Sequence, residues 1–177
     1  MKRIVALFFC LMMVLSCAAV AETAESHYTF GVSLFYRSDE FYVDIENMMK
    51  VTAENIGVEL IIQDANCDSS TQMRQFEDFI QMGVDAIVFS PCDPAACASA
   101  VQAANEAGIP VFTYDGTVQD TTGITSGMYS DFYADGYEAG TWAKNYIAEN
   151  LNGEANVAIL DYPASPIVCG ERANGFE

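Results

Sequence analysis

The sequence VDAIVFSPCDPAACASAVQAANEAGIPVFTYD, residues 84–115, contains the pattern that decides the fold. It begins and ends with a short, mostly apolar run rich in β-branched residues, and each run leads into a polar turn. Between the runs lies an alanine-rich stretch, with Asp93 suited to an N-cap and Pro94 to the first helical position. The segment therefore predicts a strand over residues 84–90, a helix that opens at Asp93 and a strand over residues 109–115.

The same unit recurs toward the N-terminus. A glycine followed at once by a β-branched residue occurs at Gly57-Val58, Gly83-Val84 and Gly108-Ile109, and glycine suits the left-handed position just past a helix. Further strands are predicted over residues 28–35 and 58–64, with amphipathic helices between them. Apolar spacing places five residues on one helix face: Phe41, Ile45, Met48, Thr52 and Ile56. Strands that alternate with single helices predict an α/β fold with a doubly wound parallel sheet.

The pattern continues toward the C-terminus but is not completed. It predicts a fifth strand over residues 124–130, a helix over residues 132–151, a strand over residues 156–162 and a helix that begins near Ile167. The sequence ends at Glu177 inside this last helix, without a capping signal. We therefore expect residues 22–130 to form a nearly complete N-terminal α/β lobe and residues 131–177 to be the start of a truncated C-terminal α/β lobe.

Residues 1–21 have the features of a secretory signal peptide. Lys2 and Arg3 precede an apolar run, and Ala19-Val20-Ala21 forms an A-x-A cleavage site. This predicts an exported protein of the periplasm or the cell-envelope surface. A lipobox-like sequence around Cys17 offers a rival processing site, at which acylation would give a lipid anchor. No later run approaches the roughly 20 apolar residues of a membrane span, so no transmembrane helix is expected in the mature chain.

Charge and aromatic content exclude two further classes. The chain has 25 acidic and 7 basic residues, for a formal net charge of −18, and loss of the signal would remove Lys2 and Arg3 as well. So acidic a chain repels phosphate backbones, and we expect no nucleic acid among its partners. An aromatic content of 12% is too high for a disordered chain.

The cysteines that follow the signal are Cys67, Cys92, Cys97 and Cys169. Cys92 and Cys97 flank a turn and could form a disulfide in an oxidising compartment; the alternative is two small buried thiols. With His27 as the single histidine and no CxxC sequence, neither a metal site nor a cofactor is expected.

Polar residues follow each predicted strand. In open α/β sheets ligands bind at the carboxyl ends of the strands, where these loops meet. The loops contain Arg37-Ser38-Asp39, Asp64-Ala65-Asn66, Ser90-Pro91-Cys92-Asp93 and Asp115-Gly116, with Phe41 and Tyr42 next to the first. Carboxylates that accept hydrogen bonds from hydroxyls, beside an aromatic ring that stacks on an apolar face, suit a polyhydroxylated ring. Ser90 and Asp131 are further candidates, although Asp131 also suits an N-cap.

The stretch from Tyr28 to Phe176 resembles the type I periplasmic sugar-binding proteins of the ribose and galactose/glucose types. The resemblance rests on GVSLFYRSDEFY, on DPAA after the third strand, on GIPVFTYD and on YSDFYADGYEAG, which follow one another in this order. It implies the substrate-binding component of an ABC importer, with a monosaccharide held between two lobes. The implied partners are the importer's membrane subunits and, in some members, a chemoreceptor.

The resemblance also implies roles for single residues. Asp39 matches a position that bonds a sugar hydroxyl, Phe41 an aromatic that stacks on the ring, and Tyr42 a second aromatic. Asp115 matches an aspartate that accepts from two hydroxyls, and Arg172, in GERANGF, an arginine contributed by the second lobe. Gly116 departs from the ribose type, which has an arginine there, and this puts ribose itself in doubt. As alternatives, Asp39 and Asp115 could cap a helix or turn, Phe41 could belong to the core, Tyr42 could face solvent and Arg172 could pair with a surface acid.

Other function classes have weaker support. The chain lacks GxGxxG, a P-loop and G-x-S-x-G, and His27 is remote from the loops, so we expect no enzyme; a metal-assisted carboxylate site is the enzymatic alternative. A lac-repressor-type regulator has the same ligand-sensing core, but the signal peptide and the acidic body argue against DNA binding. An exported signalling or chemotaxis receptor for a sugar-like or other small solute is the remaining alternative.

Overall fold

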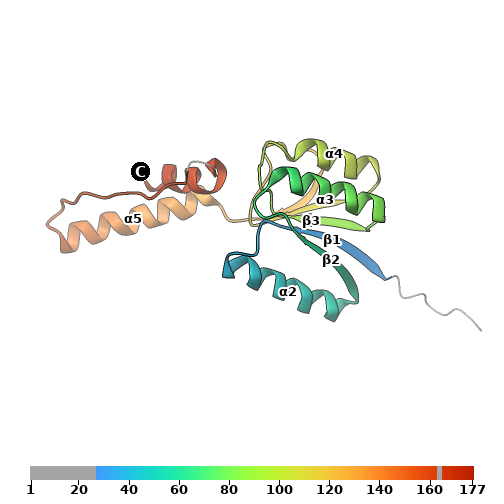
Figure 1. Cartoon of the computed structure of the whole chain (residues 1–177). Helices are drawn as coiled ribbons and strands as arrows, with labels where there is room; N and C mark the ends of the chain where they lie inside the picture. The colour runs from blue at the N-terminus through green and yellow to red at the C-terminus, as the bar shows by residue number, and fades with distance from the viewer. Residues whose placement is uncertain (1–26, 163–164) are drawn as a thin grey trace, which may run out of the picture.

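The computed structural model describes residues 27–162 and 165–177; the predicted signal peptide and Cys17 lie outside the described residues. Strands and helices alternate up to the fourth strand, as the sequence predicts, and the fifth strand follows the fourth without a helix between them (Figure 1). The elements are β1 (Tyr28–Leu34), α2 (Glu40–Ile56), β2 (Val58–Asp64), α3 (Ser69–Met82), β3 (Ala86–Phe89), α4 (Ala98–Glu106), β4 (Val111–Tyr114), β5 (Ile124–Met128), α5 (Phe132–Asn150), the short π-helical turn η1 (Pro166–Gly170) and α6 (Glu171–Phe176).

The five strands form one parallel sheet in the order β2-β1-β3-β4-β5. The chain winds from β1 outward to β2, then crosses back to β3 and continues in the other direction, so the order reverses between β1 and β3. This confirms the predicted doubly wound α/β fold, in which the reversal point at the carboxyl ends of the strands is the expected place for a ligand.

Glycines end the first two helices at the predicted positions. Gly57 and Gly83 are the C-caps of α2 and α3, with φ of 72° and 69°, and each backbone N–H donates to carbonyls of the last turn. Gly108, after α4, has φ of 78°. Because L-residues with a Cβ seldom adopt these left-handed values, the glycines fix where each helix stops and the next strand begins.

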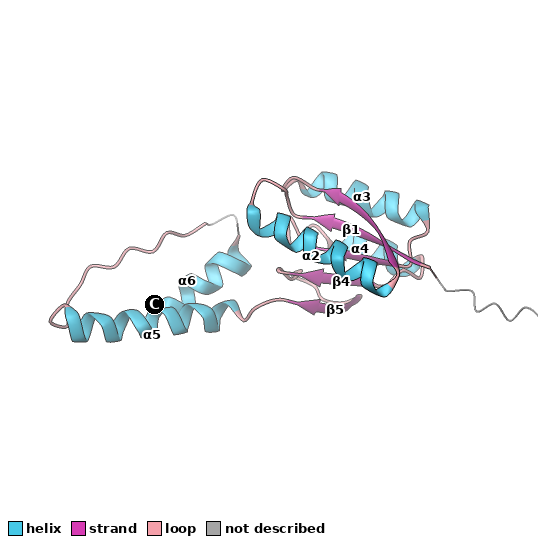
Figure 2. Cartoon of the chain, turned by 90° about the horizontal axis from the view of Figure 1, so that it is seen from below, coloured by secondary structure: helices cyan, strands magenta, loops and turns pink. Residues whose placement is uncertain are grey.

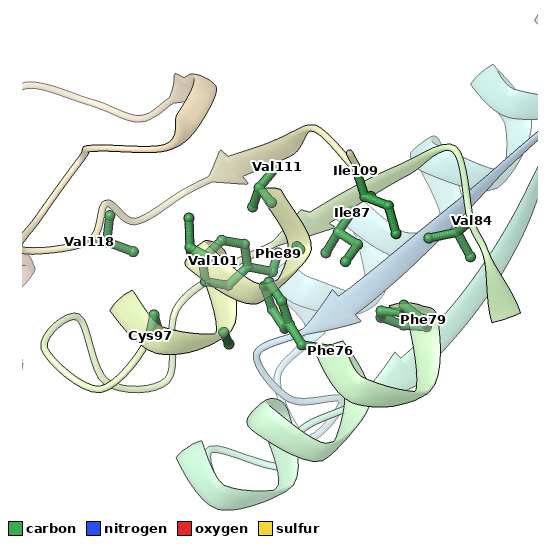
Figure 3. Packing of buried hydrophobic residues seen from close by; sticks show 12 residues of the cluster. Phe76, Phe79, Val84, Ile87, Phe89, Cys97, Val101, Ile109, Val111 and Val118 are labelled. Atoms are coloured by element: carbon green, nitrogen blue, oxygen red, sulfur yellow. The ribbon is translucent and has the colours of Figure 1, made fainter. Parts of the chain in front are cut away.

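Helices α3 and α4 cover one face of the sheet and enclose the larger core (Figure 3). Phe76 and Phe89 meet edge to face with ring centroids 4.9 Å apart. Gly31 of β1 leaves room for Phe79, since a Cβ there would lie 2.5 Å from the Phe79 ring. The buried cluster consists of Phe76, Phe79, Val84, Ile87, Phe89, Cys97, Ala100, Val101, Ala104, Ile109, Val111 and Val118.

The opposite face of the sheet is covered by α2 (Figure 1). Val32, Leu34 and Tyr114 form a small buried cluster there, with Tyr42, Ile45 and Met49 of α2 among the residues packed against it. Beside α2 an apolar groove of about 810 Å³ runs across the sheet. The predicted apolar stripe of α2 lines this groove, with Met48 63% and Ile56 65% exposed.

Two predicted elements are wrong. The third helix begins at Ala98 and not at Asp93, because Asp93 instead accepts from Ala95 N at 2.8 Å and Ala96 N at 3.3 Å and so stabilises a separate turn. Residues 156–162 are not a strand, since a strand requires a hydrogen-bonded neighbour and no described strand lies beside them.

The last part of the chain is a helical unit in which α5 and α6 pack side by side (Figure 2). Glycines allow their backbones to touch: a Cβ on Gly136 would lie 2.0 Å from Arg172 O, and one on Gly140 would lie 2.5 Å from Phe176 O. Gly175 of α6 packs equally closely on Tyr133 O. The glycines of YSDFYADGYEAG are therefore explained by helix packing.

Within residues 27–162 and 165–177, no helix has the length and apolar character needed to cross a membrane.

Candidate functional site

The polar loops meet at the carboxyl ends of the parallel strands, as predicted. The loop after β2 is tied to the end of β1 by hydrogen bonds from Ala65 N to Leu34 O at 2.9 Å and from Cys67 N to Phe35 O at 2.8 Å. Asp115 N, just past β4, donates to Met128 O at 2.8 Å. Backbone hydrogen bonds thus hold these loops at the end of the sheet where the strand order reverses.

Tyr42 and Asp115 form the centre of this site. The Tyr42 hydroxyl donates to Asp115 Oδ2 at 2.6 Å, and the Ser90 hydroxyl lies beside it. Burial, followed by the hydrogen bond to Asp115, raises the pKa of Tyr42, so the phenol stays protonated and acts as a donor. Asp115 itself has φ of 61°, a left-handed conformation that turns the chain directly after β4. Its second oxygen, Oδ1, has no hydrogen-bond donor among the described residues, so it can accept from a bound hydroxyl.

Three aromatic side chains surround Tyr42. The Phe35 ring stacks on Tyr42 at a centroid distance of 5.3 Å, and Tyr36 and Phe41 each lie 5.1 Å from it. Phe41 is 54% exposed, so it is not a core residue in this chain. The cluster offers an apolar surface next to a carboxylate, a combination suited to the two sides of a sugar-like ring.

Asp39 has the capping role that the sequence left open. Its Oδ1 accepts from Phe41 N at 2.9 Å as the N-cap of α2, and its Oδ2 accepts from Tyr36 OH at 3.1 Å. Both oxygens are therefore engaged within the first loop. A sugar contact by Asp39 stays a prediction.

An ion cluster around the buried carboxylate of Glu46, behind the first loop, was missed by the sequence analysis. Arg37 Nε and Nη2 donate to the carboxylate of Glu46 at 2.6 and 2.9 Å, and Lys50 Nζ lies 2.7 Å from Glu46 Oε1. The Arg37 hydrogen bonds, aided by Lys50, lower the pKa of Glu46 to about 2 despite its burial. The i,i+4 spacing of Glu46 and Lys50 was the available signal.

A buried glutamine network on the α3 side was also missed. Gln72 Nε2 donates to Ser33 Oγ at 3.0 Å and to Ser90 O at 2.9 Å, and Gln72 Oε1 accepts from Cys92 N at 2.9 Å. Ser33 Oγ donates to Gln75 Oε1 at 2.6 Å, while Gln75 Nε2 donates to Asp64 O at 2.9 Å. The network ties the ends of β1, β2 and β3 together under the site.

The disulfide considered for Cys92 and Cys97 is not present, because both are free thiols. Cys97 is buried and its Sγ donates to Asp93 O at 2.9 Å, inside the turn that precedes α4. Cys92 instead approaches Phe35 O, with a sulfur–oxygen distance of 3.9 Å. Of the alternative, two small buried thiols, the structure shows the buried one at Cys97, whereas Cys92 is half-buried.

The two candidates from the helical unit are not part of this cluster. Asp131 is the N-cap of α5 and accepts from Ala134 N at 3.0 Å. Arg172 Nη2 lies 3.6 Å from Asp135 Oδ2, and Arg172 Cζ lies 4.9 Å from the centroid of the Phe132 ring. The structure thus brings Asp39, Phe41, Tyr42, Ser90 and Asp115 together, and it places Asp131 and Arg172 elsewhere.

In the part of the chain that the structure describes, no group of three or more His, Cys, Asp or Glu side chains is arranged to hold a metal ion.

Polar and aromatic side chains lie at the point of reversal of a parallel α/β sheet, which is where ligands bind in open α/β proteins. The chain belongs to the periplasmic binding protein family, because the model of the periplasmic binding protein domain matches residues 30–177. This confirms the family resemblance found in the sequence.

Curated relatives and solved structures agree with this assignment. A ribose import binding protein of Bacillus subtilis is 32% identical over 152 residues, which is 86% of this chain and 48% of the relative. The ribose import binding protein of Escherichia coli is 28% identical, and the match covers 90% of this chain and 52% of the relative. A Mycobacterium smegmatis protein in complex with β-D-fucofuranose has a TM-score of 0.77 at 30% identity, covering 84% of this chain and 49% of that one. The relatives are substrate-binding proteins and not enzymes, as predicted, and the chain spans about half their length.

Proposed function

We propose that this chain contributes to the solute-binding component of an ABC-type importer and helps to bind a monosaccharide or a related cyclic polyol. The observation that carries the proposal is the contact between Tyr42 and Asp115 at the reversal point of the sheet. Oδ1 of Asp115 can accept from one ligand hydroxyl, and a ligand that displaces Tyr42 can use Oδ2 as well. A hydrogen bond to a carboxylate is worth about 1.5–3 kcal/mol, enough to distinguish epimers that offer or lack it.

The names of the relatives support this class of ligand. They include ribose import binding proteins and structures bound to β-D-fucofuranose and to myo-inositol, the last at 32% identity and a TM-score of 0.73. These ligands differ in ring size, but each presents several hydroxyls around a small ring. The Asp115 carboxylate, which can accept hydrogen bonds from such hydroxyls, and the exposed Phe41 ring suit ligands of this kind.

We further propose that residues 22–130 act as one lobe and that residues 131–177 begin a second lobe. Asp131 and Arg172 would then supply contacts from the second side when the lobes close on the ligand. Export to the periplasm or the envelope surface is part of this proposal, and a lipid anchor at Cys17 stays a prediction.

A signalling role is the second candidate. A fructose-binding periplasmic domain of a hybrid two-component system has a TM-score of 0.71 at 28% identity and covers 85% of this chain. The same site could therefore report a solute to a sensor or chemoreceptor without importing it.

Calorimetric titration of the purified chain, and of any longer gene product that contains it, would test the proposal. The panel comprises ribose, xylose, allose, fucose, fructose and myo-inositol. We expect one or more to bind, and Asp115→Asn to weaken that binding by about tenfold to a hundredfold. Asp78→Asn, which changes an exposed carboxylate on α3, should leave affinity unchanged. Absence of binding across the panel, or equal affinity of Asp115→Asn and wild type, would contradict the proposal.

A further inference from the structure

Two cysteines from different loops meet above the end of β1. Cys67 follows β2 and Cys92 follows β3, and β1 lies between these two strands in the sheet. Both reach the same carbonyl oxygen: Phe35 O is 2.8 Å from Cys67 N and 3.9 Å from Cys92 Sγ. Because both atoms lie close to Phe35 O, the distance between Cys67 N and Cys92 Sγ cannot exceed the sum of their two distances to that oxygen. The shared contact with Phe35 O thus holds the two loops against one point of the backbone, and a disulfide requires Cα atoms about 4.4–6.8 Å apart.

Accessibility favours this pair over Cys92 and Cys97. Cys67 is exposed and Cys92 is half-buried, whereas Cys97 is fully buried and its thiol is engaged with Asp93 O. Burial first, and then the neighbouring thiols with Cys67 ahead of Cys97, raise the pKa of Cys92 to about 12. Cys67 and Cys92 also share the contact with Phe35 O, although Cys97 is much closer to Cys92 in sequence.

We propose that Cys67 and Cys92 form a reversible disulfide that joins the loops after β2 and β3 across the end of β1. The structure, with both residues as free thiols, represents the reduced form. In the oxidised form the bond would restrain Phe35, whose ring stacks on Tyr42, and with it the first loop of the site. The disulfide itself can form whether or not the site binds a sugar.

The oxidant is a small exogenous disulfide such as oxidised glutathione. The exposed Cys67 thiol loses a proton and attacks one sulfur of the oxidant, which forms a mixed disulfide and releases one thiol. Cys92 then loses its proton and attacks the Cys67 sulfur, which forms the Cys67–Cys92 bond and releases the second thiol. One oxidant disulfide is reduced as two protein thiols are oxidised. Because the pKa of each thiol is raised, oxidation should accelerate as the pH rises above neutrality.

Peptide mapping can identify the bond. Trypsin cleaves after Lys50, Arg74 and Lys144, so Cys67 lies in peptide 51–74, and Cys92 and Cys97 lie in peptide 75–144. After oxidation by glutathione disulfide and alkylation of the remaining thiols, we expect these two peptides to be linked in the monomer, and to separate on reduction. Oxidation should also raise Tm by roughly 5–10 °C, because the bond closes a loop in the unfolded chain.

Three variants assign the partners. Cys67→Ser removes an exposed thiol and should abolish the link and the Tm rise; Cys92→Ala should do the same, whereas Cys97→Ala should retain the link. A persistent glutathione adduct on Cys67 with Cys92 alkylated would overturn the proposal. A bond between Cys92 and Cys97 within peptide 75–144, or a link that survives Cys92→Ala, would also overturn it. The alkylation pattern of Cys67→Ser decides the matter even if the variants at the less exposed cysteines fold poorly.

Discussion

The two faces of the sheet are built differently. On the α3/α4 face, twelve buried residues form one continuous core, and the buried amides of Gln72 and Gln75 are hydrogen-bonded to the strand ends. On the α2 face, three buried residues form a small core beside a groove of about 810 Å³ whose apolar walls are partly exposed. The candidate site lies at the end of the sheet between these two environments. Its loops are thus fixed from one side, while Tyr42 and Phe41 belong to the less tightly packed α2.

This difference indicates that the two faces of the sheet have different roles, one in stability and one in exposing the candidate site. The α3/α4 face supplies most of the packing energy, because buried apolar area contributes about 25 cal/mol per Å² and that face buries more of it. The α2 face leaves side chains of the site accessible to a ligand. Substitutions on the first face should therefore reduce stability, whereas matched substitutions along the groove should have little effect on it.

Phe76→Ala should cause the largest loss. Phe76 is fully buried between α3 and the sheet and meets Phe89 edge to face. Its truncation removes this packing and leaves a cavity, so we expect the free energy of unfolding to fall by about 3–5 kcal/mol in urea denaturation. The comparison is Met48→Ala on the groove side, where 63% of the side chain is already exposed. That change should cost under about 1 kcal/mol, and equal losses from the two variants would refute the asymmetry.

Gln72→Met tests the polar part of the same face. The change keeps the side-chain volume but removes the partners of Ser90 O and Cys92 N, which remain at the end of β3. Unpaired buried groups cost about 1–3 kcal/mol, so we expect a loss of about 2–3 kcal/mol and faster hydrogen exchange at Cys92 N. Gln102→Met is the control, because Gln102 is exposed on α4 and bonds only to Glu106 among the described residues. A stability loss without faster exchange at Cys92 N would argue against a role in fixing the loop.

The fold could be predicted in large part because its signals are local. Apolar runs, helical spacing and the glycine of each unit depend on neighbouring residues, and Gly57 and Gly83 indeed have left-handed φ values. Asp93-Pro94 carried a local start signal too, yet the aspartate stabilises a turn and α4 starts later. Residues 156–162 resemble a strand in composition, but pairing depends on a partner that no local pattern contains.

The site was predictable where topology alone decides it. Parallel strands bring their carboxyl ends to one edge, which was sufficient to place the loop of Asp115 at the same edge as the loop next to Tyr42. The hydrogen bond between the two side chains was not predicted. Glu46 and Gln72 could not be found in this way, because a polar residue inside an amphipathic helix is normally solvent-facing. Their burial arises from how α2 and α3 lie on the sheet. The hydrogen-bond partners that compensate for this burial come from distant loops.

Glu46→Gln should have the smallest effect of the three and the clearest pH dependence. Because the folded-state pKa of Glu46 is lowered to about 2 from an ordinary 4.5, its ion pairs stabilise the protein fully above the ordinary value. This contribution is lost as the pH falls from about 4.5 through about 2. Arg37 and Lys50 are about half exposed, so screening by solvent reduces the expected gain to about 1–2 kcal/mol. In urea denaturation we expect wild type to exceed Glu46→Gln by this amount at pH 6 and the two to converge near pH 2. Glu77→Gln, at an exposed position of α3, should follow wild type throughout. Parallel curves for wild type and Glu46→Gln down to pH 2 would show that the carboxylate is not held ionised by Arg37, and that this ion pair does not attach α2 to the first loop.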